Sequence, residues 1–115
     1  MDGETYIYVL RLEDGKYYVG KTTNVQKRLK EHQEMRGSAW TRKYRVQQLM
    51  GTSLMDSGFD EDNKVKELME KHGISNVRGG SYSQIDLPEA KVQTIKAEIS
   101  SATRTVAFSV MVRDT

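Results

Sequence analysis

The chain has 115 residues, a formal net charge of +2 and no cysteine. With 37% hydrophobic and 30% charged residues, it suits one compact globular domain and excludes disulfides and thiolate zinc sites. No apolar run approaches the roughly 20 residues that cross a bilayer, and no hydrophobic signal segment opens the chain, so we expect an intracellular protein, cytoplasmic or nuclear, with no membrane partner.

An aromatic hairpin is expected near the N-terminus. Residues 5–12 and 16–21 are rich in Tyr, Val and Ile, as strands are, and Asp14-Gly15 between them is a strong turn signal. Thr23-Asn24 can cap a helix over residues 25–35. The first part of the chain therefore predicts two strands followed by a helix.

The rest of the chain predicts one more strand and two more helices. Residues 45–50 form the strand candidate, and the Ser/Gly-rich residues 51–58 indicate a loop. The helices are expected over 60–71, ending at a glycine, and from the lone proline at 88 to about 102. The segment SNVRGGSYS is too glycine-rich for regular structure throughout. The tail TVAFSVMV could be an edge strand, a partner-binding strand or an appended segment.

The order β-β-α-β-α-α indicates an α+β fold with a small three-stranded antiparallel sheet flanked by helices. We expect residues 1–87 to form the main domain. Residues 88–115 would add a C-terminal helix and tail packed on the same domain.

Charge is distributed unevenly. Residues 21–45 carry eight basic and two acidic side chains, and residues 56–71 carry six acidic and three basic ones. A basic segment beside an acidic one suggests a phosphate-facing surface next to a metal-capable one. Two solvated faces of opposite sign would give the same pattern.

Two expected helices place polar groups on their apolar sides. Arg28 and His32 fall close to the Val25–Leu29 stripe, and Glu61 lies one turn before Val65. Charges turned toward a sheet are costly unless paired, so these positions are candidates for a site. Each also has a structural explanation: Arg28 can extend along the surface, His32 can be a satisfied boundary residue, and Glu61 suits a helix N-terminus.

These segments, in this order, resemble the GIY-YIG nuclease domain over roughly residues 5–83. The motifs are YIYVL, YYVGKT, NVQKRLKEH, an acidic residue opening a later helix, and SNVRGGSY; Tyr6 and Val19 depart from the family pattern. The resemblance implies cleavage of nucleic acid with one divalent metal ion. The site residues that it implies by position are Tyr8, Tyr18, Lys21, Arg28, His32, Glu61 and Asn76.

Phosphodiester hydrolysis needs a base, charge stabilisation and alignment. We expect Tyr8 to act as the base on the attacking water, assisted by Lys21 or His32, and Tyr18 to position the water or a phosphate oxygen. A phenol is a weak base unless its pKa of about 10 is lowered, and Lys21, Arg28 and a metal are expected to lower it. The planar Arg28 guanidinium would stabilise phosphate charge.

The remaining roles concern the metal and the DNA. Glu61 would hold Mg²⁺ (or Mn²⁺), since one protein carboxylate is enough for this ion, and Asn76 would brace the site. Trp40 could stack on an unpaired base or, more commonly for a lone tryptophan, belong to the core. The candidate phosphate contacts are Lys27, Lys30, Arg36, Arg42 and Lys43.

This scheme requires both phenols on one face of the sheet. A two-residue Asp14-Gly15 loop would place them on opposite faces. A three-residue loop of residues 13–15 pairs Leu10 with Tyr18 and Tyr8 with Gly20, so that both phenols share a face. We therefore expect the three-residue loop, a type I turn followed by left-handed Gly15. Gly20 opposite Tyr8 would also let the backbone approach a phosphate.

Three functions are compatible with the sequence. The first is a metal-dependent DNA endonuclease, and the second is a non-catalytic nucleic-acid-binding module that retains the fold. The third is a protein–protein adaptor that uses the tail, residues 104–115, for strand addition. A domain of this size offers little reading surface, so a homodimer, an additional DNA-binding domain or a partner protein would supply specificity.

Overall fold

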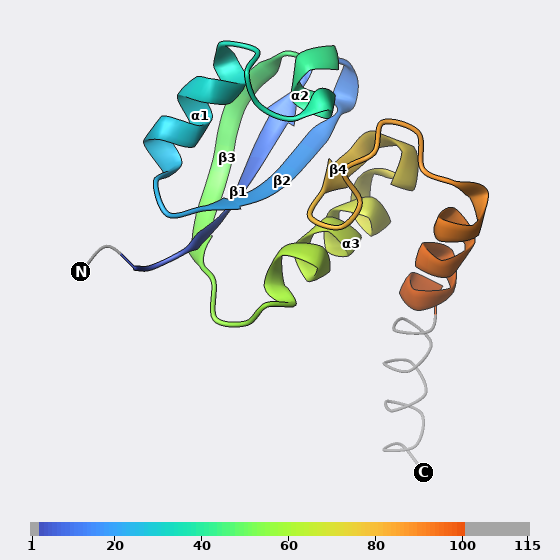
Figure 1. Cartoon of the computed structure of the whole chain (residues 1–115). Helices are drawn as coiled ribbons and strands as arrows, with labels where there is room; N and C mark the ends of the chain where they lie inside the picture. Colours follow the sequence, from blue (N-terminus) through green and yellow to red (C-terminus); the bar gives the residue numbers. More distant parts are fainter. Residues whose placement is uncertain (1–2, 101–115) are drawn as a thin grey trace.

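A computed structural model describes residues 3–100 as an α+β fold with helices on both faces of one mixed sheet (Figure 1). Within these residues, no helix is both long and apolar enough to cross a membrane. A further helical segment covers residues 89–100. In chain order the elements are β1 (Tyr6–Leu12), the 3-10 turn η1 (Glu13–Gly15), β2 (Tyr17–Thr22), α1 (Val25–Gln33), α2 (Ala39–Lys43), β3 (Val46–Leu54), α3 (Asp60–His72), η2 (Ile74–Asn76) and β4 (Val77–Gly79).

The β1–β2 hairpin has the register expected for a three-residue loop. Leu10 lies opposite Tyr18 and Tyr8 lies opposite Gly20, so the two phenols share a face. The expected left-handed Gly15 is confirmed, but the type I turn before it is wrong. Asp14 (φ 62°) and Gly15 (φ 71°) are both left-handed, and the Lys16 N–H donates to the Glu13 carbonyl at 3.3 Å, as in a type I′ turn. Aspartate tolerates this backbone region better than most residues.

The sheet has a fourth strand that corrects the expected three-stranded antiparallel arrangement. The strand order is β3-β1-β2-β4, and β4 pairs parallel to β2 with Gly79 opposite Val19. Gly79 has a φ of 149°, and a Cβ there would overlap the Val19 carbonyl. The sequence analysis treated the glycines of this segment as evidence against regular structure. Gly79 is instead what lets β4 approach β2 closely enough to pair.

Two further elements differ from expectation. β3 continues to Leu54 with Gly51 opposite Val9, so the start of the expected 51–58 loop is a strand. The short helix α2 was not expected; Ser38 caps it by accepting the Thr41 N–H. Helices α1 and α3 end within two residues of their expected C-termini. The tail, residues 104–115, lies outside the described part of the chain.

Each face of the sheet has its own core. Alternate residues of β1 and β2 point to opposite faces, as the strand period requires. The core under α1 and α2 contains Tyr8, Leu10, Leu12, Tyr18 and Trp40. The core under α3 and the 89–100 helix contains Ile7, Val19, Val65, Leu68, Met69, Val77 and Ile95.

Trp40 belongs to the core. Its side chain is 2% exposed, and its indole N–H donates to the Tyr17 carbonyl at 2.9 Å. A buried ring cannot stack on an unpaired base, so the structure supports the core interpretation of this residue.

Arg78 is a buried cation that the sequence analysis did not single out. Its guanidinium donates to the carbonyls of Gln84 and Ile74, both at 2.7 Å, and lies 4.8 Å from the Trp40 ring. Burial lowers the pKa of Arg78. Arg78 therefore ties residues 84–85 and η2 to the core beneath α2.

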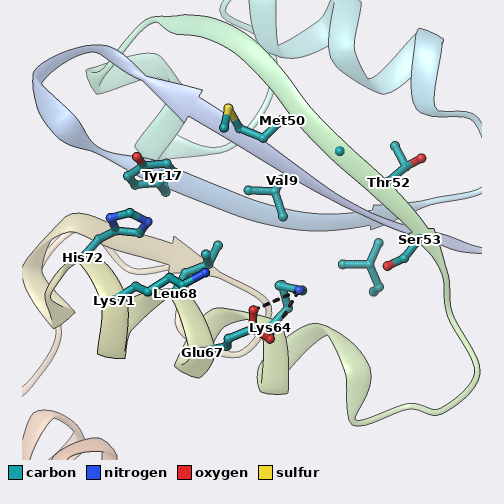
Figure 2. Close-up of a pocket in the computed structure, with 12 residues that line it drawn as sticks. Val9, Tyr17, Met50, Thr52, Ser53, Lys64, Glu67, Leu68, Lys71 and His72 are labelled. Carbon is teal, nitrogen blue, oxygen red and sulfur yellow. Dashed lines mark hydrogen bonds and ion pairs between the residues drawn. The ribbon is translucent and has the colours of Figure 1, made fainter.

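Part of the sheet on the α3 side is left uncovered. Between α3 and the strands β1 and β3 lies a hollow of about 390 Å³ (Figure 2). Its lining is mixed: Ile7, Val9 and Leu68 contribute apolar surface, and Lys64 and Lys71 contribute charge. This hollow lies on the face opposite the phenols of Tyr8 and Tyr18.

Arg78→Lys should lower the free energy of unfolding by about 2–3 kcal/mol, because an ammonium cannot reproduce the planar set of donors that several carbonyls share. Arg11→Lys, at an exposed position of β1, should change it by less than about 0.5 kcal/mol. Urea denaturation of both variants measures the difference. Equal free energies of unfolding for the two variants would show that the hydrogen bonds of the Arg78 guanidinium do not stabilise the fold.

Candidate active site

Three aromatic side chains meet beneath α1. Tyr8 and Tyr18 are 2% and 7% exposed, and their ring centroids lie 6.3 Å apart. The His32 ring lies 5.7 Å from Tyr8 and 5.1 Å from Tyr18. The hairpin register supplies the two phenols, and α1 supplies the imidazole.

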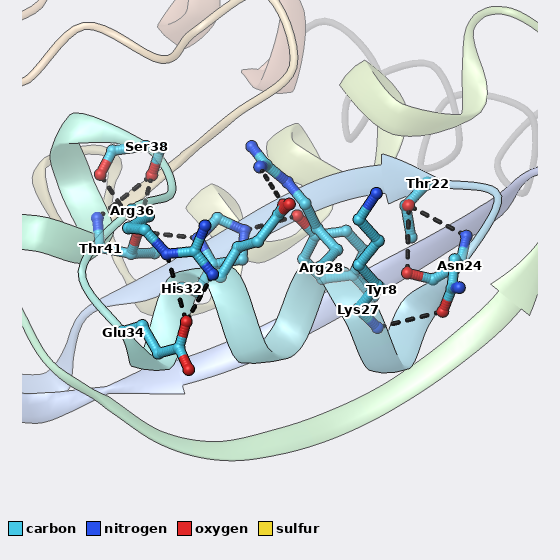
Figure 3. A network of polar contacts seen from close by, with 11 residues as sticks. Tyr8, Thr22, Asn24, Lys27, Arg28, His32, Glu34, Arg36, Ser38 and Thr41 are labelled. Carbon is cyan, nitrogen blue, oxygen red and sulfur yellow. Dashed lines mark hydrogen bonds and ion pairs between the residues drawn. The ribbon is translucent and has the colours of Figure 1, made fainter.

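A chain of hydrogen bonds runs from Tyr8 into the protein (Figure 3). The Tyr8 hydroxyl lies 2.7 Å from His32 Nε2, and His32 Nδ1 lies 2.8 Å from the Thr41 hydroxyl. His32 is fully buried. Asn24 caps α1 by accepting the Lys27 N–H at 3.0 Å, which fixes where the helix begins and turns the His32 side toward the sheet.

Burial sets the protonation of this pair. It raises the pKa of Tyr8, and the opposing effect of the Arg28 guanidinium is smaller. Arg28 does lower the Tyr8 pKa, as expected, but burial outweighs this effect, so the expected net lowering of the Tyr8 pKa is wrong. Burial, with the Arg28 charge, lowers the pKa of His32 to about 4, so the imidazole is neutral near pH 7.

Arg28 lies at the margin of the aromatic cluster. Its Nη1 donates to Glu31 at 2.8 Å, and this bond raises the pKa of Arg28. The guanidinium also interacts with Tyr8 and Tyr18, where it favours the phenolate forms. With a side chain 34% exposed, Arg28 links the buried phenols to solvent.

Glu61 approaches from the other side of the sheet. β4 ends at Gly79, opposite Val19, so the edge of β2 beyond this point is not covered by β4. The first turn of α3 lies there, and Lys21 Nζ is 3.9 Å from a Glu61 carboxylate oxygen. Burial raises the pKa of Glu61, and its charge in turn raises the pKa values of Tyr8 and Tyr18.

The three consecutive acidic residues of α3 have different partners. Asp60 accepts the N–H groups of Asp56 and Ser57, at 2.7 and 3.0 Å. Asp62 accepts the Ser81 N–H at 2.9 Å and the Ser81 hydroxyl at 2.7 Å. Asp60 and Asp62 thus anchor loops, whereas Glu61 faces Lys21.

The donor set near the phenols fits one hard cation. Among residues 3–100, no group of three or more His, Cys, Asp or Glu side chains could hold a metal ion. Glu61 offers a partly buried carboxylate, with a side chain 14% exposed, that is not held by an arginine as Glu31 is. Mg²⁺ commonly takes one or two protein carboxylates and completes its shell with water and phosphate oxygens, so a single carboxylate is compatible with it.

Asn76 lies apart from these groups. Its carbonyl oxygen accepts from Lys16 Nζ at 2.7 Å, and its amide donates to the His72 carbonyl at 2.7 Å. The side chain therefore closes the C-terminal end of α3 against the start of β2. The structure brings Tyr8, Tyr18, Arg28 and His32 together, places Lys21 and Glu61 at the adjoining sheet edge, and leaves Asn76 at the α3–β4 junction.

The candidate DNA contacts belong to the helical layer above the phenols. Lys27 and Lys30 lie on α1, Arg42 and Lys43 lie on α2, and Arg36 lies between the two helices. All five are exposed. Glu34 pairs with both Lys30 and Arg36, which offsets part of their charge.

Thr41 is a site residue that the sequence analysis missed. The Ser38 cap could have indicated the short α2. No local pattern, however, indicates that the buried hydroxyl of Thr41 meets His32 from a different helix.

A family model described as the GIY-YIG catalytic domain matches residues 4–79. The match includes the phenols, α1, the first turn of α3 and β4. No solved structure matches the chain significantly.

Several relatives carry the name UPF0213 protein. The one from Halalkalibacterium halodurans is 32% identical over 82 residues, covering 67% of this chain and 87% of the relative. The one from Natronomonas pharaonis is 34% identical over 71 residues, covering 59% and 84%. The match to the Streptococcus sanguinis protein, 50% identical over 42 residues, spans only about half of that relative (48%). The name states no activity.

Gly20→Ala should destabilise the fold by about 1–3 kcal/mol, since a Cβ at this position would overlap the Tyr8 phenol. The space beside the Gly20 Cα is thus filled by the Tyr8 phenol. Gly51→Ala is the matched control, because a Cβ at that strand position meets nothing within 4 Å. Thermal unfolding compares the two, and equal melting temperatures would contradict the close approach.

Acid should destabilise the protein through His32. Between pH 6.5, the ordinary pKa of histidine, and about 4, its folded-state value, the unfolded chain binds a proton that the folded chain excludes. Stability is therefore lost as pH falls through this window, by up to about 3 kcal/mol. Denaturation of wild type and His32→Gln across pH 4–7 measures this component, which the variant should lack; parallel pH profiles would contradict a buried neutral imidazole.

Proposed function

The chain belongs to the GIY-YIG family, and from this we propose that it is a metal-dependent endonuclease that hydrolyses phosphodiester bonds in DNA. The observation that carries the proposal is the buried Tyr8–His32 hydrogen bond of 2.7 Å, beside Tyr18 and the Arg28 guanidinium. A phenol bonded to a neutral imidazole and flanked by a cation is suited to moving a proton next to an anionic substrate.

In the proposed reaction, the attacking water gives its proton to the Tyr8 oxygen while the Tyr8 proton passes to His32 Nε2. The new bond forms between the water oxygen and phosphorus. The bond between phosphorus and the 3′ oxygen breaks, and the departing 3′ oxygen takes a proton from solvent. Of the two groups expected to assist Tyr8, His32 contacts the phenol directly, whereas the Lys21 ammonium lies 3.9 Å from Glu61. His32 is therefore assigned the assisting role.

Arg28 would stabilise the charge that develops on the phosphate. Its Nη1 is held by Glu31, which orients the guanidinium while leaving the cation partly exposed beside Tyr8. A planar fork fixed in this way can donate to phosphate oxygens with little reorganisation. Tyr18, on the neighbouring strand, would position the water or a phosphate oxygen.

Glu61 would hold the divalent ion, Mg²⁺ or Mn²⁺. When bound, the ion supplies electrostatic stabilisation of the scissile phosphate and the departing 3′ oxygen. Lys21 already pairs with this carboxylate across 3.9 Å, so it would turn toward phosphate when the cation takes its place. Asn76 would brace the α3–β4 junction and so act on the site only indirectly.

Lys27, Arg42 and Lys43 lie on the exposed layer above the phenols and would contact DNA phosphates together with Lys30 and Arg36. Such contacts position the duplex without reading its sequence. Specificity would therefore come from a second copy, an additional domain or a partner protein.

Purified protein should nick supercoiled plasmid when Mg²⁺ or Mn²⁺ is present and stop when EDTA is added. Tyr8→Phe, Arg28→Ala and Glu61→Gln should each lower the cleavage rate about 10²–10⁴-fold, because each removes a proton-transfer group, a phosphate cation or the metal ligand. Gel assays of nicked and linear plasmid measure the rates.

Matched controls separate chemistry from folding. Tyr6→Phe and Glu67→Gln change the same residue types at positions outside the phenol cluster and should keep near wild-type rates. Wild-type protein that binds DNA and leaves it intact with every divalent ion would overturn the enzyme proposal and favour a non-catalytic binding module.

A further inference from the structure

Thr41 sits at a buried junction of hydrogen bonds. The side chain is fully buried, and its hydroxyl lies 2.8 Å from His32 Nδ1, 3.1 Å from the Ser38 hydroxyl and 3.1 Å from the Ser38 carbonyl. On the opposite side of the imidazole, His32 Nε2 is hydrogen-bonded to the Tyr8 hydroxyl (Figure 3). The direction of the Thr41 hydroxyl proton therefore affects which His32 nitrogen is protonated, and so whether the Tyr8 hydroxyl donates to His32 or accepts from it.

A threonine hydroxyl has one proton to donate and can accept two hydrogen bonds. A carbonyl oxygen can only accept, so the contact with the Ser38 carbonyl requires the Thr41 proton to lie there. The Thr41 oxygen then accepts from His32 Nδ1 and from the Ser38 hydroxyl. This arrangement satisfies all three contacts at once.

The opposite arrangement satisfies fewer contacts. If Thr41 donated to His32 Nδ1, its oxygen and the Ser38 carbonyl would face each other at 3.1 Å with no proton between them. The carbonyl would keep its bond from the Arg42 N–H, but the two oxygens would repel. The donor count therefore favours a proton on Nδ1.

The hydrogen bond at the other ring nitrogen of His32 is consistent with a proton on Nδ1. A neutral imidazole with a proton on Nδ1 has a bare Nε2, so the Tyr8 hydroxyl donates to it across 2.7 Å. The Tyr8 oxygen keeps its lone pairs, which suits the nearby Arg28 charge that favours the phenolate form. With the other tautomer, Tyr8 would accept from His32, and its own proton would need another acceptor.

Local packing holds the imidazole in this position. A Cβ at Gly37 would overlap His32 Nδ1 and Cε1, so the chain between α1 and α2 closes directly over the ring. Ser38 orients Thr41 by accepting its backbone N–H at 3.1 Å. The ring is thus held between a glycine and a hydroxyl that the α2 cap positions.

We propose that Thr41 is a positioning residue that fixes His32 as the Nδ1–H tautomer, so that Nε2 is free to accept the Tyr8 proton. The catalytic consequence rests on the proposed nuclease function; the tautomer itself does not. α2 would then serve the reaction without touching substrate.

The tautomer can be measured without any substrate. Long-range proton–nitrogen NMR spectra of ¹⁵N-histidine-labelled protein distinguish protonated from bare ring nitrogens, and the chain has only two histidines, assigned with His72→Gln. Wild-type His32 should show a protonated Nδ1 and a bare Nε2 at pH 7. A protonated Nε2 would overturn the proposal, whatever the variants do.

Two substitutions test the role of the hydroxyl. Thr41→Val keeps the shape and removes the hydroxyl, so it should shift His32 toward the Nε2–H tautomer and slow nicking about 10–100-fold. DNA affinity should change less than about twofold. Thr41→Ser should restore the Nδ1–H signal and most of the rate, and Thr94→Val, at an exposed helical threonine, should change neither. An unchanged tautomer in a folded Thr41→Val would also overturn the proposal.

The outcomes separate the two proposals. An Nδ1–H tautomer in a protein that nicks no DNA leaves the role of Thr41 in place and removes the enzyme assignment. An Nε2–H tautomer in an active nuclease removes the proposed role of Thr41 and leaves the enzyme assignment in place.

Discussion

The register of the β1–β2 hairpin is the constraint on which the rest of the site depends. With Tyr8 opposite Gly20 and Leu10 opposite Tyr18, both phenols enter the core beneath α1. A slip of one residue would send one strand's side chains to the face beneath α3 and break the bond between Tyr8 and His32. The pairing is specified sterically as well, because only glycine at position 20 leaves space for the Tyr8 ring.

The short fourth strand explains how groups from opposite faces of the sheet can meet. β4 pairs with β2 only along Tyr17–Val19, so Gly20 and Lys21 on β2 are not paired with β4. The first turn of α3 lies close to these residues, with Glu61 near Lys21, and a side chain at Gly80 would collide with Asp62. Glu61 thereby comes within electrostatic reach of phenols that belong to the other core.

The sequence predicted what local patterns encode. The hairpin, α1, α3 and the inward side of Arg28 and His32 follow from alternation, helical periodicity and caps. β4 could not be predicted, because its pairing is parallel and remote in sequence, and Gly79 serves a steric need that opposes strand propensity. Thr41 was equally hidden, since its role depends on the packing of α2 against α1. Charge alone also misjudged Tyr8, because burial outweighed the neighbouring cation.

Burial of the phenol restricts how the proposed chemistry can proceed. The same low-dielectric surroundings that raise the pKa of Tyr8 lower that of His32, so an isolated phenolate–imidazolium pair is unfavourable in this site. A relay avoids the phenolate, because Tyr8 gains a proton from water as it gives one to His32 and stays neutral throughout. The imidazolium that forms is still disfavoured by burial and by the Arg28 charge, so the negative charge developing on the phosphate must offset it. Positive charge then develops on the imidazole while negative charge develops on the phosphate, beside Arg28. Burial, which makes Tyr8 a poor independent base, is thus compatible with its use as a proton conductor.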